Sequence, residues 1–233
     1  MTDRAAVWDA LGTVRDPELD RPITDLGFVT EAVVTDEGAG GADVRVRLRL
    51  PTYFCAPNFA YLMVADAYDA LRALGGVGDV QVRLEDHFAA EEINGGVAER
   101  AGFGGAFPGQ ATGELAELRR TFRRKAHTAC LERVCRKLLA TGLAAEDLAG
   151  LHIGDVPESA ERTALVRRRA ELGLPAGPDA PLVVGDDGAP VPVGGVAARL
   201  RFAMAVRVSI DGNAGWCGGL LRTRYGTPTE DAT

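Results

Sequence analysis

The spacing of apolar residues predicts two helices and three strands near the start of the chain. Residues 4–14 and 61–74 carry apolar side chains at helical spacing. Residues 44–50 and 77–84 alternate between apolar and polar, as strands with one buried face do, and residues 28–35 form a further predicted strand. The first two strands can pair as a hairpin, and the intervening helix permits a parallel pairing of the second and third. We therefore predict an α+β fold, a three-stranded mixed sheet covered by helices.

The remainder of the chain predicts a mainly helical part. Residues 112–141 contain no proline and form the longest predicted helix, and Val196–Ile210 fits either a buried helix or a strand. The glycine-rich segment Asp211–Gly219 that follows lacks the acidic spacing of a calcium loop. Other predicted elements are helices at 89–101, 144–151 and 158–172 and a short hairpin within 175–192. The predicted domains are residues 1–88 and residues 89–233.

Composition and charge narrow the class of protein. Of 233 residues, 46% are hydrophobic and 25% charged, as in ordinary globular proteins. Residues 1–92 hold 17 acidic and 8 basic side chains (net −9), whereas residues 93–233 hold 16 and 18 (net +2). An acidic first part would be repelled by phosphate, so we predict no nucleic-acid partner. No apolar run approaches the ~18 residues of a membrane span, and no signal peptide is evident, so we predict a cytoplasmic protein without a membrane partner.

The cysteines point to one candidate reactive residue. Four cysteines are widely spaced without a C-x-x-C pair, which argues against a disulfide scaffold and a zinc ribbon. Cys55 lies between a predicted strand and a predicted helix, flanked by Pro51 and Pro57. A helix N-terminus favours the thiolate, so this position suits chemistry or metal binding. The alternative is a small buried hydrophobic residue.

Three ordered motifs carry a resemblance to a known family. They are Asp16-Pro-Glu-Leu19, Ile23-Thr-Asp-Leu-Gly-Phe-Val29 and Leu50-Pro-Thr-x-x-Cys-x-Pro57. Over residues 4–86 the chain resembles the metal–sulfur cluster biosynthesis family, which includes SufT and PaaD; Phe28 stands where that family commonly has Leu or Ile. The resemblance implies assistance in assembling or inserting iron–sulfur or related iron centres, not turnover of a small molecule. It covers nothing beyond residue 86, so the C-terminal extension stays unassigned.

The resemblance also implies a set of metal ligands. Cys55 matches the characteristic thiol of the family, and Asp16, Glu18 and Asp25 match its acidic positions. Sulfur and oxygen ligands together suit ferrous iron or an iron–sulfur cluster held transiently. Each carboxylate has an alternative role as a turn or capping residue. A further thiol for Cys55 must come from the C-terminal part, from a second subunit of a homodimer, or from a client protein.

Residues outside these motifs offer weaker metal-ligand candidates. His87 follows the third predicted strand and pairs with Glu91 if the chain is helical there; the alternative is a plain surface histidine. Cys130 and Cys217 are further candidate ligands, with a packed thiol as the alternative for each.

The longest predicted helix carries candidate partner-binding residues. These are Arg119, Arg123, Arg124, Lys125 and His127. They form either a docking surface for an acidic partner or a solvated face.

The sequence thus predicts a maturation factor, not an enzyme. It would deliver iron or a cluster to a client metalloenzyme or work with iron–sulfur assembly proteins, and analogy with PaaD suggests a bacterial multicomponent oxygenase as the client. The alternative is a metal-free, chaperone-like binding module. An enzyme with Cys55 as nucleophile needs a paired base, and no histidine stands in a recognisable pairing with it.

Overall fold

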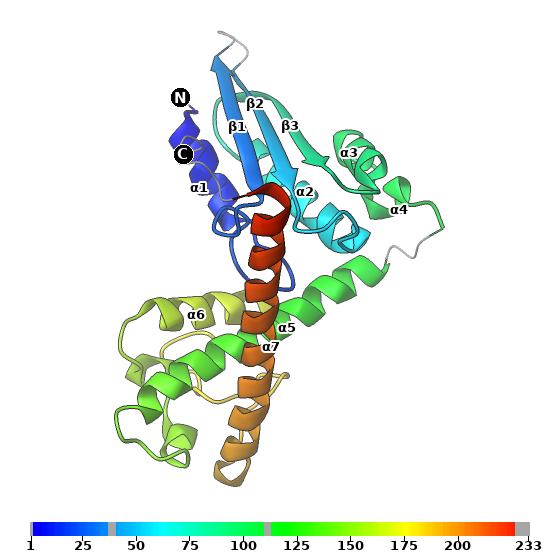
Figure 1. The fold of residues 1–233 in the computed structure, drawn as a ribbon. Helices are drawn as coiled ribbons and strands as arrows, with labels where there is room; N and C mark the ends of the chain where they lie inside the picture. Colours follow the sequence, from blue (N-terminus) through cyan, green and yellow to red (C-terminus); the bar gives the residue numbers. More distant parts are fainter. Residues whose placement is uncertain (1, 37–40, 110–112, 227–233) are drawn as a thin grey trace. The chain divides into compact units, whose positions relative to one another are not determined.

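The computed structural model describes residues 2–36, 41–109 and 113–226, which divide into two compact units. The first unit comprises Met1–Ala116 with Asn213–Thr233, and the second comprises Glu117–Gly212. Helices α5 (Gly113–Leu139) and α7 (Val193–Tyr225) each contribute residues to both units (Figure 1). The division differs from the predicted boundary at residue 88, because residues 89–116 and the end of α7 join the first unit.

The first unit contains the predicted three-stranded mixed sheet. Strands β1 (Val29–Asp36) and β2 (Ala42–Arg49) are antiparallel, and β3 (Val77–Glu85) lies parallel to β2 on its other side. Helix α2 (Pro57–Arg72) supplies the crossover between the two parallel strands (Figure 1). The predicted α+β class is confirmed. The predicted turn at 37–41 lies almost wholly outside the described residues.

Alternation along β2 explains how the sheet buries one face. Val44, Val46 and Leu48 are buried, whereas Arg45 and Arg47 point to solvent. The apolar sides of α2 and α1 (Arg4–Thr13) join the same core. Asp3 begins α1 by accepting a hydrogen bond of 2.8 Å from the backbone N–H of Ala6, as N-cap residues do.

Helices α3 (Ala90–Ala98) and α4 (Gly102–Ala106) extend this core beyond the predicted boundary. Ile93 and Phe103 are buried in it, and the Phe103 ring meets Tyr61 edge to face with centroids 5.4 Å apart. A Cβ on Gly96 would lie 2.3 Å from the Cβ of Ala106, so only glycine allows the two helices to approach this closely.

The second unit has a core of its own. Its elements are most of α5, the 3₁₀ turns η2 (Asp147–Gly150) and η3 (Ile153–Asp155), helix α6 (Ala160–Leu172) and the first part of α7. The C-terminal part is thus mainly helical, as predicted, although the predicted helix at 144–151 is only a 3₁₀ turn and the predicted hairpin only an isolated bridge between Val184 and Pro190.

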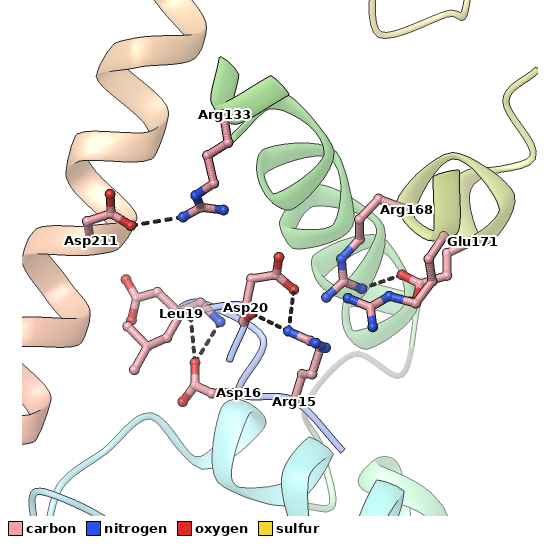
Figure 2. A network of polar contacts seen from close by, with 10 residues as sticks. Arg15, Asp16, Leu19, Asp20, Arg133, Arg168, Glu171 and Asp211 are labelled. Atoms are coloured by element: carbon pink, nitrogen blue, oxygen red, sulfur yellow. Dashed lines mark hydrogen bonds and ion pairs between the residues drawn. The ribbon is translucent and has the colours of Figure 1, made fainter. Parts of the chain in front are cut away.

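Buried charged groups of the second unit have partners. Arg169 is fully buried and donates hydrogen bonds to the backbone carbonyls of Pro175, Pro181 (2.8 Å) and Leu182 (2.5 Å), which fixes the segment after α6. Arg207 on α7 lies 2.6 Å from the carboxylate of Glu132 on α5. Figure 2 shows two further pairs, Arg168–Glu171 and Arg133–Asp211.

Helix α7 departs furthest from expectation. It runs for 33 residues, through Val196–Ile210, for which the sequence left helix or strand open, and on through the glycine-rich segment Asp211–Gly219. Each glycine inside a helix costs roughly 1 kcal/mol relative to alanine, so tertiary packing must stabilise this stretch. Among the described residues, no helix has both the length and the apolar character that crossing a membrane requires.

Candidate functional site

Cys55 lies in the connection from β2 to α2. Its thiol is half-buried two residues before Pro57, the first residue of α2. The carbonyl of Cys55 lies 2.7 Å from Nε2 of His87, and Nδ1 of His87 accepts from the N–H of Ala89 at 3.2 Å. Because Nδ1 accepts, Nε2 carries the proton and donates to Cys55. The segment after β3 therefore anchors the loop that carries the thiol.

His87 anchors the Cys55 loop through its imidazole ring. Both ring nitrogens are engaged by backbone groups, and burial lowers the pKa of His87, which keeps the imidazole neutral. Glu91, its predicted partner, is exposed on α3 and lines a groove of about 880 Å³ between β3 and α3. The structure does not bring the two residues together.

Asp16 serves the turn between α1 and β1, and its charge also acts on the Cys55 thiol. Its Oδ1 accepts hydrogen bonds of 2.8 Å from the N–H groups of Glu18 and Leu19 (Figure 2). Both bonds use Oδ1, so Oδ2 is not needed by the turn. Burial raises the pKa of Asp16 to about 6, although the two N–H bonds act in the opposite direction. The predicted turn role and proximity to Cys55 thus coexist.

Glu18 and Asp25 differ in their relation to the site. Glu18 is half-buried and its Oε1 accepts from Nδ2 of Asn213 at 3.1 Å. Asp25 is exposed, with Thr24 Oγ1 at 3.5 Å from its Oδ1, and it is not among the groups that act on the Cys55 thiol. Of the three predicted carboxylates, the structure groups Asp16 and Glu18 with Cys55.

The end of α7 covers the loops that carry the motifs. Asn213 bonds Glu18, and Leu221 packs over Gly27, where a Cβ would lie 3.4 Å from Leu221 Cδ2. Arg224 donates to the carbonyls of Leu50 (3.4 Å) and Asp86 (3.0 Å). Cys217 lies on the same side of this helix segment. The sequence did not reveal this docking, because its contacts join residues far apart in the chain.

The charges around Cys55 raise the thiol pKa. Burial is the largest cause, followed by Asp16 and Cys217, and together they raise the pKa of Cys55 to about 12. Burial, then Asp16 and Glu18, also raise the pKa of Cys217. The prediction that the helix start would favour the Cys55 thiolate is therefore wrong for this environment, because desolvation and acidic neighbours outweigh the single N–H bond from Ala56.

The remaining candidates belong to the second unit. Cys130 is buried in its core beside Leu131 and Val134, so it packs apart from the Cys55 group. His127 is 1% exposed, and burial, then Arg169 and Arg199, lower its pKa to about 4, so it is not part of an exposed docking face. Arg119 and Arg123 are half-buried, while Arg124 and Lys125 are exposed.

The site combines soft and hard donors without forming a complete cage. In the described part of the chain, no group of three or more His, Cys, Asp or Glu side chains is arranged to hold a metal ion. Aromatic side chains beside Cys55 reach solvent: Phe54 is 75% exposed, and Tyr53 and Phe88 are about half exposed with ring centroids 6.3 Å apart. Thiols beside an exposed apolar patch suit the capture of a cation at a protein interface.

Comparisons with known proteins identify the family of the first part of the chain. Residues 4–84 match the family model described as iron-sulfur cluster assembly protein. The protein named "Uncharacterized protein MJ1129" of Methanocaldococcus jannaschii is 33% identical over 94 residues, which are 40% of this chain and 93% of that protein. No solved structure matches the chain. Through residues 4–84, which hold Cys55, Asp16 and Glu18, the chain belongs to the iron–sulfur cluster assembly protein family.

Proposed function

We propose that this protein is a maturation factor that receives iron or an iron–sulfur cluster at Cys55 and passes it to a client metalloenzyme or another assembly protein. The observations that carry this proposal are the family match over residues 4–84 and, within it, the half-buried Cys55 thiol and the buried Asp16 carboxyl. Both groups are acids that burial keeps protonated more readily, and a cation relieves the cost of ionising them together. The cargo is thus bound as a substrate and not as a resident cofactor.

The binding is transient because this group supplies few ligands. The described residues form no complete metal cage, so the remaining coordination positions fall to sulfide, to the client, or to a second copy in a homodimer. Four other candidates take no part in this binding. Asp25 and Glu91 are exposed, the ring of His87 is engaged by backbone groups, and Cys130 is packed in the core of the second unit. A site with open positions can release its cargo by ligand exchange.

The partner docks on the aromatic patch formed by Tyr53, Phe54 and Phe88. Exposed apolar side chains grouped around a reactive residue are typical of protein interaction sites. The basic side chains of Arg119, Arg123, Arg124 and Lys125 offer a second contact for an acidic partner. By analogy with PaaD, the client is a multicomponent oxygenase. We place this activity in the cytoplasm, where thiols stay reduced.

The test is reconstitution with ferrous iron and sulfide under anaerobic conditions. The full chain should bind iron stoichiometrically and transfer a cluster to apo-ferredoxin, Cys55→Ala should lose both abilities, and Cys130→Ala, which changes a thiol in the other unit, should keep them. Iron content and the visible absorption of the cluster are the measurements. If the wild-type chain binds no iron, or if Cys55→Ala binds iron and transfers a cluster as the wild type does, the carrier proposal fails and a metal-free docking module takes its place.

Catalysis by Cys55 is not proposed. A cysteine nucleophile needs a base or a lowered pKa, whereas the pKa of this thiol is raised and both nitrogens of the nearby His87 are engaged. Alkylation of Cys55 by iodoacetamide should remain slow at pH 7 in the metal-free protein.

A further inference from the structure

Cys217 lies outside the family match, on a helix that returns to the family domain from the far end of the chain. Asn213, Cys217 and Leu221 follow one another at four-residue spacing, so they share one side of α7. Asn213 bonds Glu18 and Leu221 packs over Gly27, one turn to either side of Cys217. The thiol between these two contacts is therefore turned toward the motif loops.

The packing of the two cysteines agrees with this placement. Cys55 and Cys217 are both half-buried and both lie against the core cluster of the first unit, which also includes Ala214 and Leu221 from α7. The charges of Asp16 and Glu18 act on both thiols, and Cys217 also acts on Cys55. Cys217 and the residues that position it therefore belong to the surroundings of Cys55.

We propose that Cys217 is a second thiolate ligand of the Cys55 site, so that this chain holds ferrous iron between two cysteines contributed by opposite ends of its sequence. This inference rests on the proposed function and adds a ligand that the family domain lacks. Each thiol releases a proton to solvent as its sulfur binds the metal, and no oxidant or reductant is needed. Two thiolates occupy half of a tetrahedral iron or cobalt site, and the other positions stay open for sulfide or a client.

An alternative role for Cys217 is a simple apolar contact between α7 and the sheet domain. In that role alanine would replace it without effect on metal binding. As a ligand, it cannot be replaced by alanine without a change in the metal spectrum. Metal spectroscopy therefore separates the two roles.

The experiment is anaerobic titration of the full-length protein with Co²⁺, followed by competition with Fe²⁺. The thiolate-to-cobalt charge-transfer band grows with the number of sulfur ligands. For Cys217→Ala we expect about half of the wild-type band intensity and a dissociation constant raised by at least about 10-fold, as for the loss of other metal-site groups. Cys55→Ala should show a comparable loss. Trp216→Ala, an exposed neighbour on the same helix, and Cys130→Ala, a thiol of the second unit, are the controls and should match the wild type.

A second readout tests proximity without any metal. Phenylarsine oxide binds two adjacent thiols far more tightly than one, so it should be retained by the wild type and by Cys130→Ala but lost from either single variant of the pair. If Cys217→Ala equals the wild type in both assays while Cys55→Ala loses the cobalt band, Cys217 is a packing residue and the function proposed for Cys55 stands. If the wild type shows no thiolate band at all, the proposed function itself fails.

Discussion

The two units bury charge in opposite ways. In the second unit, the fully buried Arg169 meets three backbone carbonyls and Glu132 meets Arg207. In the first unit, the charged groups that act on Cys55, namely Asp16, Cys217 and Glu18, are all acidic. A buried charge with partners stabilises one arrangement of the chain, whereas acidic groups gathered without a counter-charge are typical of a site that awaits a cation.

The largest change in stability should come from replacing Arg169, whose buried charge has hydrogen-bond partners. Arg169→Met keeps the volume but leaves three buried carbonyls without their donor, so we expect the free energy of unfolding to fall by about 3 kcal/mol or more. Urea denaturation followed by circular dichroism measures it. Arg167→Met, on the exposed side of the same helix, should change stability by less than about 0.5 kcal/mol. A loss below about 1 kcal/mol in Arg169→Met would mean that its hydrogen bonds are not a structural requirement.

Replacing Asp16, one of the acidic groups that act on Cys55, should have the opposite effect on stability. Asp16→Asn keeps an oxygen for the N–H groups of Glu18 and Leu19 but cannot ionise, so it should stabilise the metal-free protein at pH 7. Raising the carboxyl pKa from 3.8 to about 6 corresponds to about 3 kcal/mol as an upper estimate. Because the folded pKa is the higher one, the wild type should lose stability as the pH rises from about 4 to above 6, and Asp16→Asn should not.

Denaturation across this pH range, with exposed Asp25→Asn as control, checks the expectation. A variant that is less stable than wild type at pH 7 would show that Asp16 acts in the turn alone. Weaker iron binding together with higher stability would show that the site is maintained at a cost to the fold.

The smallest effect concerns the docking of α7. Arg224→Met removes the hydrogen bonds to the carbonyls of Leu50 and Asp86 and should lower the stability of the docked segment by about 1 kcal/mol. Hydrogen exchange should accelerate in residues 213–225 but not in residues 196–210 of the same helix. Arg222→Met, an exposed neighbour, should leave exchange unchanged. Equal acceleration in both segments would indicate that the helix responds as one piece.

Local pattern was sufficient to predict the sheet domain and the position of Cys55 between a strand and a helix. Residues 44–50 and 77–84 alternate as strands do, and the segment between them has helical spacing. Together these patterns predict a βαβ crossover, and a strand, a helix and a strand lie at these positions. The position of Cys55 followed from the strand before it and from Pro57 after it. These features depend on neighbours close in sequence.

The docking of α7 and the role of His87 depend on contacts that no local pattern reveals. The bond between Asn213 and Glu18 joins residues 195 positions apart. Four glycines between residues 212 and 219 favour a loop by propensity, and packing against the first unit overrides that preference. For His87, the deciding fact was likewise tertiary, because its ring bonds the carbonyl of Cys55, 32 positions away.

The return of α7 to the first unit also sets an order of events during synthesis. The sheet domain leaves the ribosome with Cys55 long before Cys217 is made, and domains fold in that order as the chain emerges. An early domain has its own core but lacks the segment Asn213–Tyr225 that covers its motif loops. The two-thiol site proposed above therefore needs α7 to be translated and docked, and a chain stalled before Asn213 would hold only one of the two thiols.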